Sequence, residues 1–164
     1  MEEKQYPQIN EKIKQRRLEL GLTDSEVARQ TNMTIYEYGD VESHADEIFV
    51  VVPLYHVKKL INTLKTDFFD LFSIPCAFCE DGFTHFDEYW LRRNSLVKKK
   101  REMLGLSTDE LGDKVGFFQT EIELVETYVA HLESWVIENI FHLANQLQIP
   151  PQVLLDIHCH KCKS

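Results

Sequence analysis

The chain has 164 residues, of which 43% are hydrophobic and 27% charged, with only 6 Gly and 5 Pro, and this composition excludes a disordered or low-complexity protein. The formal net charge of −9 argues against indiscriminate binding to nucleic acid, because attraction to phosphates needs positive charge, but it is compatible with a local basic face. The longest apolar stretch, residues 48–55, is far too short to cross a bilayer, and the first residues lack the pattern of a secretory signal, so we expect a cytoplasmic protein without a membrane partner.

The chain contains an internal repeat. The stretch IKQRRLELGLTDSEVA (residues 13–28) aligns with VKKKREMLGLSTDELG (97–112), and a C-x-x-C pair ends each half at a matching place. Agreement in order, glycines and cysteines predicts a tandem duplication. We expect a first unit over residues 1–79, a connector over 80–93 and a second unit over 94–164.

The first unit is predicted to have five helices. The apolar residues that mark the first helix are Ile9, Ile13, Leu18 and Leu20, and Gly21 would end it. Two capping boxes start the second and third helices: Thr23 with Glu26, and Thr34 with Glu37. A loop follows the third helix near residue 42, and two more helices are expected near residues 54–64 and 67–72.

The connector and the second unit continue this helical pattern. The connector, EDGFTHFDEYWLRR, combines a turn signal with an aromatic surface and is expected to be partly helical. In the second unit the first helix should end near Leu104, and Ser107 with Glu110 forms a capping box for the next. A third helix to about Glu126, a fourth ending near Leu147 and a short fifth over residues 150–156 complete the prediction.

Both units carry the motif R-x-x-x-G-L-T/S, then a capped second helix and an apolar–Glu pair that ends the third helix. This pattern resembles the Cro and phage-repressor (Xre-type) helix-turn-helix family. The resemblance implies an all-α fold of two tandem, lambda-repressor-like five-helix units. It also implies ion pairs between Arg17 and Glu42 and between Arg101 and Glu126, and the function of a sequence-specific DNA-binding transcriptional regulator.

Candidate contacts to double-stranded DNA follow from the resemblance and from the basic first helices. The third helix of such a unit lies in the major groove, where its first residues read bases, and the first helix passes near the phosphates. The candidate DNA-binding residues are Lys14, Arg16, Arg17, Thr34, Ile35, Tyr36, Lys98, Lys100, Gln119 and Thr120. The alternative for the basic residues is a solvated helix face.

The sequence departs from the family at positions that contact DNA. The residue after the cap of the second helix is usually Gln, but here it is Asp24 in the first unit and Thr108 in the second. Neither third helix has an Arg or Lys near its start to read guanine. A protein-interaction module of antitoxin or adaptor type, on a scaffold that has lost DNA contact, is therefore the alternative function, and the chain is expected to be a monomer or a homodimer.

All four cysteines lie in the two C-x-x-C pairs, within SIPCAFC and DIHCHKC. Tetrahedral zinc needs two such pairs, so we expect one structural zinc ion held by Cys76, Cys79, Cys159 and Cys162, which would clasp the two units together. His158 or His160 replacing one thiolate is an alternative. Cysteines that only pack in the core, and a redox pair, are the other interpretations.

No enzyme signature is present. The sequence lacks the phosphate-binding G-x-x-x-x-G-K-[ST] and the nucleophile motif G-x-S-x-G, and its histidines show no H-E-x-x-H spacing. A zinc ion with four protein ligands leaves no open position for catalysis. We therefore predict a protein that is not an enzyme.

Overall fold

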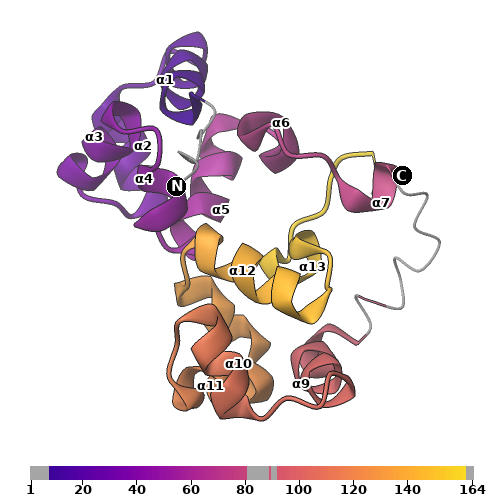
Figure 1. Cartoon of the computed structure of the whole chain (residues 1–164). Helices are drawn as coiled ribbons and strands as arrows, with labels where there is room; N and C mark the ends of the chain where they lie inside the picture. Colours follow the sequence, from indigo (N-terminus) through magenta and orange to yellow (C-terminus); the bar gives the residue numbers. More distant parts are fainter. Residues whose placement is uncertain (1–7, 81–88, 90–91, 162–164) are drawn as a thin grey trace. The chain divides into compact units, whose positions relative to one another are not determined.

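A computed structural model describes residues 8–80, 89 and 92–161 of the chain, and the regular elements of this part are all helices, without strands (Figure 1). The all-α class is therefore confirmed. The chain divides into two compact units, Met1–Pro75 and Cys76–Ser164. The first C-x-x-C pair thus groups with the second unit, whereas the sequence analysis placed the boundary after it. Most of the connector lies outside the described residues.

The first unit contains six described helices: α1 (Ile9–Glu19), α2 (Asp24–Thr31), α3 (Ile35–Ser43), α4 (Glu47–Val50), α5 (Leu54–Leu64) and α6 (Phe68–Phe72). Helix α2 packs against α3 and α5, and α1 packs against α3 and α6. The core is apolar because one stripe of each helix is buried, with Val57, Leu60 and Leu64 of α5 fully enclosed. Tyr38 of α3 is also completely buried.

The starts and ends of these helices follow the local signals in the sequence. Both capping boxes are formed, and their backbone and side-chain hydrogen bonds lower the pKa of Glu26 and of Glu37. Gly21 ends the first helix with φ +67°, a left-handed conformation that costs glycine little. One expectation was wrong, because Leu18 is 60% exposed. The expected loop after α3 is present at residues 44–46, and the short helix α4, which was not predicted, follows it.

The second unit repeats the plan with α7 (Ala77–Glu80), α9 (Arg93–Met103), α10 (Thr108–Val115), α11 (Gln119–Thr127), η1 (Val129–Ser134), α12 (Ile137–Leu147) and α13 (Pro151–Leu155). The 3-10 helix η1 occupies the place of α4. Ser107 and Glu110 form the expected capping box. Phe118 provides no side-chain cap for α11, and Glu121 instead pairs with His131 of η1 at 2.9 Å.

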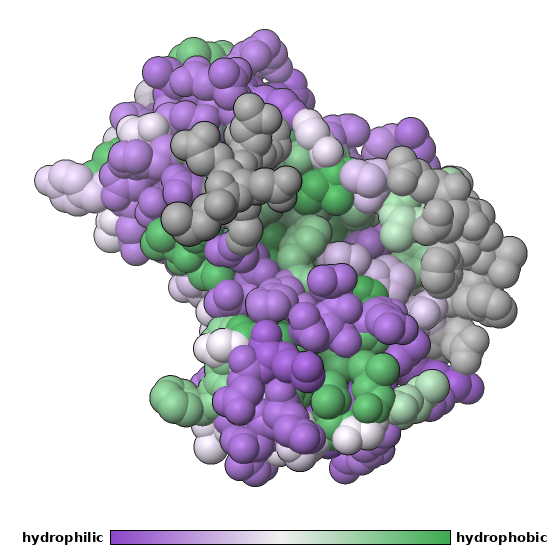
Figure 2. Space-filling model, viewed as in Figure 1, coloured by the Kyte–Doolittle hydropathy of each residue, from purple (hydrophilic) through white to green (hydrophobic). Residues whose placement is uncertain are grey.

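The face of each unit seen in Figure 2 is mainly polar. Hydrophilic residues cover most of the visible face of each unit, with hydrophobic side chains between them (Figure 2). None of the helices in the described ranges combines the length and the apolar character needed to cross a bilayer.

Candidate metal centre and nucleic-acid surface

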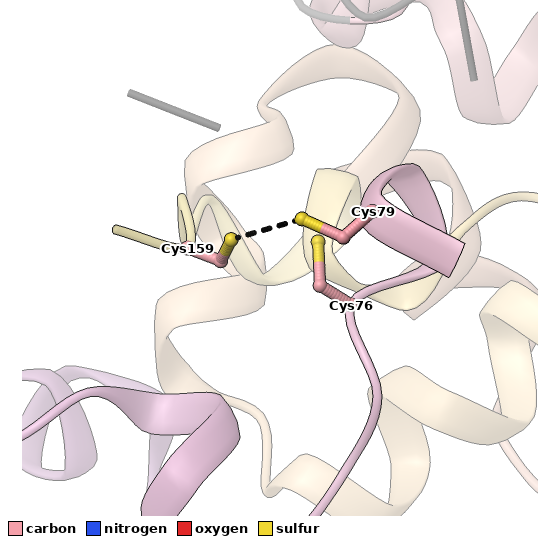
Figure 3. A group of neighbouring side chains, drawn as sticks. All are labelled: Cys76, Cys79 and Cys159. Atoms are coloured by element: carbon pink, nitrogen blue, oxygen red, sulfur yellow. Dashed lines mark hydrogen bonds between the residues drawn. The ribbon is translucent and has the colours of Figure 1, made fainter. Parts of the chain in front are cut away.

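Three cysteines of the second unit form a cluster (Figure 3). Cys76 precedes α7, Cys79 lies in α7, and Cys159 follows α13, with their sulfur atoms all within 4.8 Å of one another. The Sγ atoms of Cys79 and Cys159 are 3.5 Å apart. Zinc–sulfur bonds of about 2.3 Å in a tetrahedron place sulfurs about 3.8 Å apart, whereas a disulfide joins them at about 2.05 Å. The spacing therefore suits ligands of a shared metal ion.

The same kind of backbone turn precedes Cys76 and Cys159. Ser73 ends α6 with φ +52°, and Asp156 ends α13 with φ +55°. The chain turns out of the helix at these left-handed residues, and Cys76 and Cys159 each follow three residues later. A bond from Cys79 N to Cys76 O of 3.0 Å then closes the first pair into a tight turn. Cys162, the expected fourth ligand, lies outside the described residues.

Helix α13 also supplies a polar group to the cluster. The Nε2 of Gln152 lies 3.5 Å from the Sγ of Cys76, and Gln152 is only 4% exposed. Cys76 and Cys159 are buried, while Cys79 is exposed. An amide N–H that donates to a thiolate offsets part of its charge and orients it, as groups around metal ligands commonly do. Gln152 carried no signal in the sequence, because only the packing of α13 brings it to Cys76.

The two expected ion pairs are confirmed. Arg17 bonds Glu42 through Nε at 2.6 Å and Nη2 at 2.9 Å, and Arg101 bonds Glu126 in the same way at 2.6 and 3.0 Å. Burial opposes the charge of Glu42, but hydrogen bonds from Arg17 and Tyr38 hold its pKa below the ordinary value. Hydrogen bonding to Glu42 likewise raises the pKa of Arg17.

These bidentate pairs fix the third helix of each unit to the first. The side chains of Arg17 and Glu42 are each only 12% exposed. Arg17 was also a candidate for phosphate contact, but its guanidinium is engaged within the unit, because Nη1 additionally donates to the backbone oxygen of Leu22 at 3.0 Å. Its contribution is therefore to hold the unit together.

The candidate base-reading residues lie at the exposed starts of α3 and α11. Ile35 is 40% and Tyr36 82% exposed, while Thr34 accepts the cap bond from Glu37 N. In the second unit Thr120 is exposed, and Gln119 donates to Glu123 at 2.7 Å. The neighbouring cap residue Phe118 is 84% exposed. Both helices therefore present side chains to solvent at the place where the resemblance requires them.

The candidate phosphate contacts differ in their surroundings. Lys14 and Lys98 are exposed and Lys100 is half-buried. Arg16 donates to backbone oxygens at the end of α5. Arg93 joins α9 to α13 through bonds to Val153 O (2.8 Å) and Leu154 O (3.0 Å).

No family model matches the chain, and neither a curated protein nor a solved structure matches it.

Proposed function

We propose that the chain is a DNA-binding transcriptional regulator that carries two helix-turn-helix units. One observation carries the proposal: in each unit a capped second helix leads through a tight turn into a third helix whose first residues are exposed. The bidentate Arg–Glu pair holds that third helix against the first. A rigid, exposed helix next to a basic first helix is the arrangement that helix-turn-helix proteins insert into the major groove.

Selection of bound genomic fragments at moderate salt tests this proposal. The expected result is enrichment of fragments that share a sequence, and replacement of Lys98 and Lys100 by Glu should abolish their binding in a gel-shift assay. Phosphate contacts give binding that weakens steeply with salt, with a slope of about 0.9 for each phosphate neutralised. Selection that enriches no sequence would refute sequence-specific binding.

A protein-interaction module is the second candidate, and the third helices favour it. Helix α3 carries Glu37 and Asp40 without a basic residue, and Tyr36 beside them is 82% exposed. Acidic side chains repel phosphates, whereas exposed aromatics commonly anchor protein interfaces. Loss of a partner's binding on Tyr36→Ala, with binding kept on replacement of Lys98 and Lys100, would support this candidate against the first.

We also propose that the three clustered cysteines, with Cys162 as fourth ligand, hold a structural zinc ion. Thiolates at tetrahedral spacing favour zinc over the harder divalent cations, which prefer oxygen ligands. Bound there, the ion would join the segment before α9 to the tail after α13. Metal analysis of protein purified under reducing conditions should find about one zinc ion per chain. Absence of zinc in that preparation, with cobalt(II) giving no thiolate charge-transfer band, would refute the site.

A further inference from the structure

The first helices of the two units use their cations differently. The basic residues of α1 are Lys12, Lys14, Arg16 and Arg17, and those of α9 are Arg93, Lys98, Lys99, Lys100 and Arg101. In the internal alignment Lys14 matches Lys98 and Arg16 matches Lys100. Because the two helices have the same place in duplicated units, the contacts of their basic residues can be compared position by position.

In α1 most of the positive charge is already engaged. Arg16 donates to Leu64 O at 3.0 Å and Lys65 O at 3.3 Å, where it satisfies the carbonyl end of α5, and it also pairs with Glu19 at 2.9 Å. Lys12 donates to the hydroxyl of Ser73 at the end of α6. These cations of α1 therefore bind the ends of helices in their own unit.

Arg17 is bound to Glu42, as described above. Lys14 is thus the one basic side chain of α1 that makes no hydrogen bond or ion pair within the described ranges, and two acidic residues, Glu11 and Glu19, lie on the same helix. A phosphate backbone that approached α1 would meet one unengaged cation and two carboxylates.

Helix α9 presents the opposite balance. Arg93 and Arg101 are engaged within the unit, but Lys98, Lys99 and Lys100 make no hydrogen bond or ion pair among the residues that the structure describes. Lys98 and Lys99 are exposed. Glu102 is the only acidic residue of α9, so three adjacent cations remain available for phosphates.

The first residue of the second helix differs in the same direction, although each first turn carries two carboxylates, Asp24 and Glu26 in α2 and Asp109 and Glu110 in α10. This first residue is Asp24 in α2 and Thr108 in α10. Asp24 is exposed, and its carboxylate accepts a bond from Ser25 N at 2.9 Å. A helix N-terminus attracts anions through its unsatisfied N–H groups, and a carboxylate there already occupies that place and repels a phosphate. Thr108 is neutral and its hydroxyl is a hydrogen-bond donor.

We infer that the second unit alone makes the phosphate contacts of the first and second helices, through Lys98, Lys99, Lys100 and Thr108. At the equivalent positions of the first unit, Arg16 is engaged within the unit, Asp24 is acidic, and only Lys14 is an unengaged cation. This inference rests on the proposed DNA-binding function and names the unit and the side chains that perform it. It predicts a nucleic-acid footprint centred on the second unit.

Fluorescence anisotropy with a labelled 30-base-pair duplex of random sequence tests the inference, because binding to such a probe reports phosphate contacts. The dissociation constant is measured over a salt series, and each phosphate contact contributes about 0.9 to the slope of log affinity against log salt. The Lys98→Gln, Lys99→Gln double variant should lower this slope by about 1.8. Lys14→Gln, the same substitution at the equivalent position of the first unit, should lower it by less than half of one contact.

Exchanging the first residues of the two second helices tests the role of Thr108 and Asp24. Thr108→Asp should weaken binding to the duplex, and Asp24→Thr should not. The thermal unfolding midpoint of each variant is measured as well, and a midpoint equal to that of the wild type shows that the fold is kept. Equal losses from Lys14→Gln and Lys98→Gln, or a wild-type slope in the Lys98 and Lys99 variant, would overturn the inference while leaving DNA binding intact. Wild-type protein that shows no salt-dependent binding would refute the proposed function itself.

Discussion

Replacing Gly112 by alanine should destabilise the second unit, although the same change elsewhere in a helix usually stabilises. Gly112 lies inside α10, and a Cβ atom built on it would meet the backbone oxygen of Phe117 at 2.6 Å. It would also lie 3.4 Å from the backbone nitrogen of Gln119. The obstacle is the backbone of the turn between α10 and α11, which cannot rotate away as a flexible side chain would.

Two opposing effects set the magnitude. Alanine in a helix interior gains about 0.5–1 kcal/mol over glycine because it restricts the unfolded chain. An added atom in a closely packed site costs about 1–3 kcal/mol. The net loss should be about 0.5–2 kcal/mol, which lowers the unfolding midpoint by several degrees, since about 1 kcal/mol corresponds to 4–8 °C in a domain of this size.

Gly39 in α3 provides the matched control. A Cβ atom at this position has nothing within 4 Å, so Gly39→Ala should raise stability by about 0.5–1 kcal/mol. Both variants are compared with the wild type by urea and thermal unfolding, followed by circular dichroism. If Gly112→Ala raises the midpoint as Gly39→Ala does, the close approach of the turn to α10 is refuted.

Three further predictions concern the ion pair and the metal centre. Glu42→Gln should cost about 2–3 kcal/mol at neutral pH, less than a fully buried pair because the side chains keep 12% exposure. Because the pKa of Glu42 is lower in the folded than in the unfolded state, the ion pair contributes fully to stability above the unfolded pKa of about 4.3, and this contribution is lost as the pH falls through the folded pKa. Urea titrations should therefore show that Glu42→Gln loses less stability than the wild type between pH 5 and 3. A parallel pH dependence of the two proteins would contradict this. Removal of metal by a chelator under reducing conditions should lower the stability of the second unit by up to about 4–5 kcal/mol. This is the entropy of closing the loop between Cys79 and Cys159, which are 80 positions apart, and an unchanged unfolding curve would count against a structural metal. Gln152→Leu removes the N–H donor to Cys76 and should weaken cobalt(II) binding about 10–100-fold in a chelator competition, whereas wild-type affinity would show that this contact has no effect on the metal.

The sequence by itself determined the features that depend on neighbouring residues. The capping boxes at Thr23, Thr34 and Ser107 were predictable because the cap and its partner are three residues apart. The turn at Gly21 was predictable because few residues other than glycine adopt a positive φ readily. The two Arg–Glu ion pairs were predicted from the family resemblance, because the family's motif implies this longer-range contact.

Tertiary structure decided how side chains with the same local pattern are used. Arg16 and Lys100 occupy equivalent positions, but only Arg16 bonds the end of a helix 48 residues away, where packing brings the Leu64 carbonyl within reach. Leu18 fits the helical pattern and is nevertheless 60% exposed. Gln152 approaches Cys76 across 76 residues of chain. Such contacts depend on where whole helices pack, and no local pattern of residues encodes that placement.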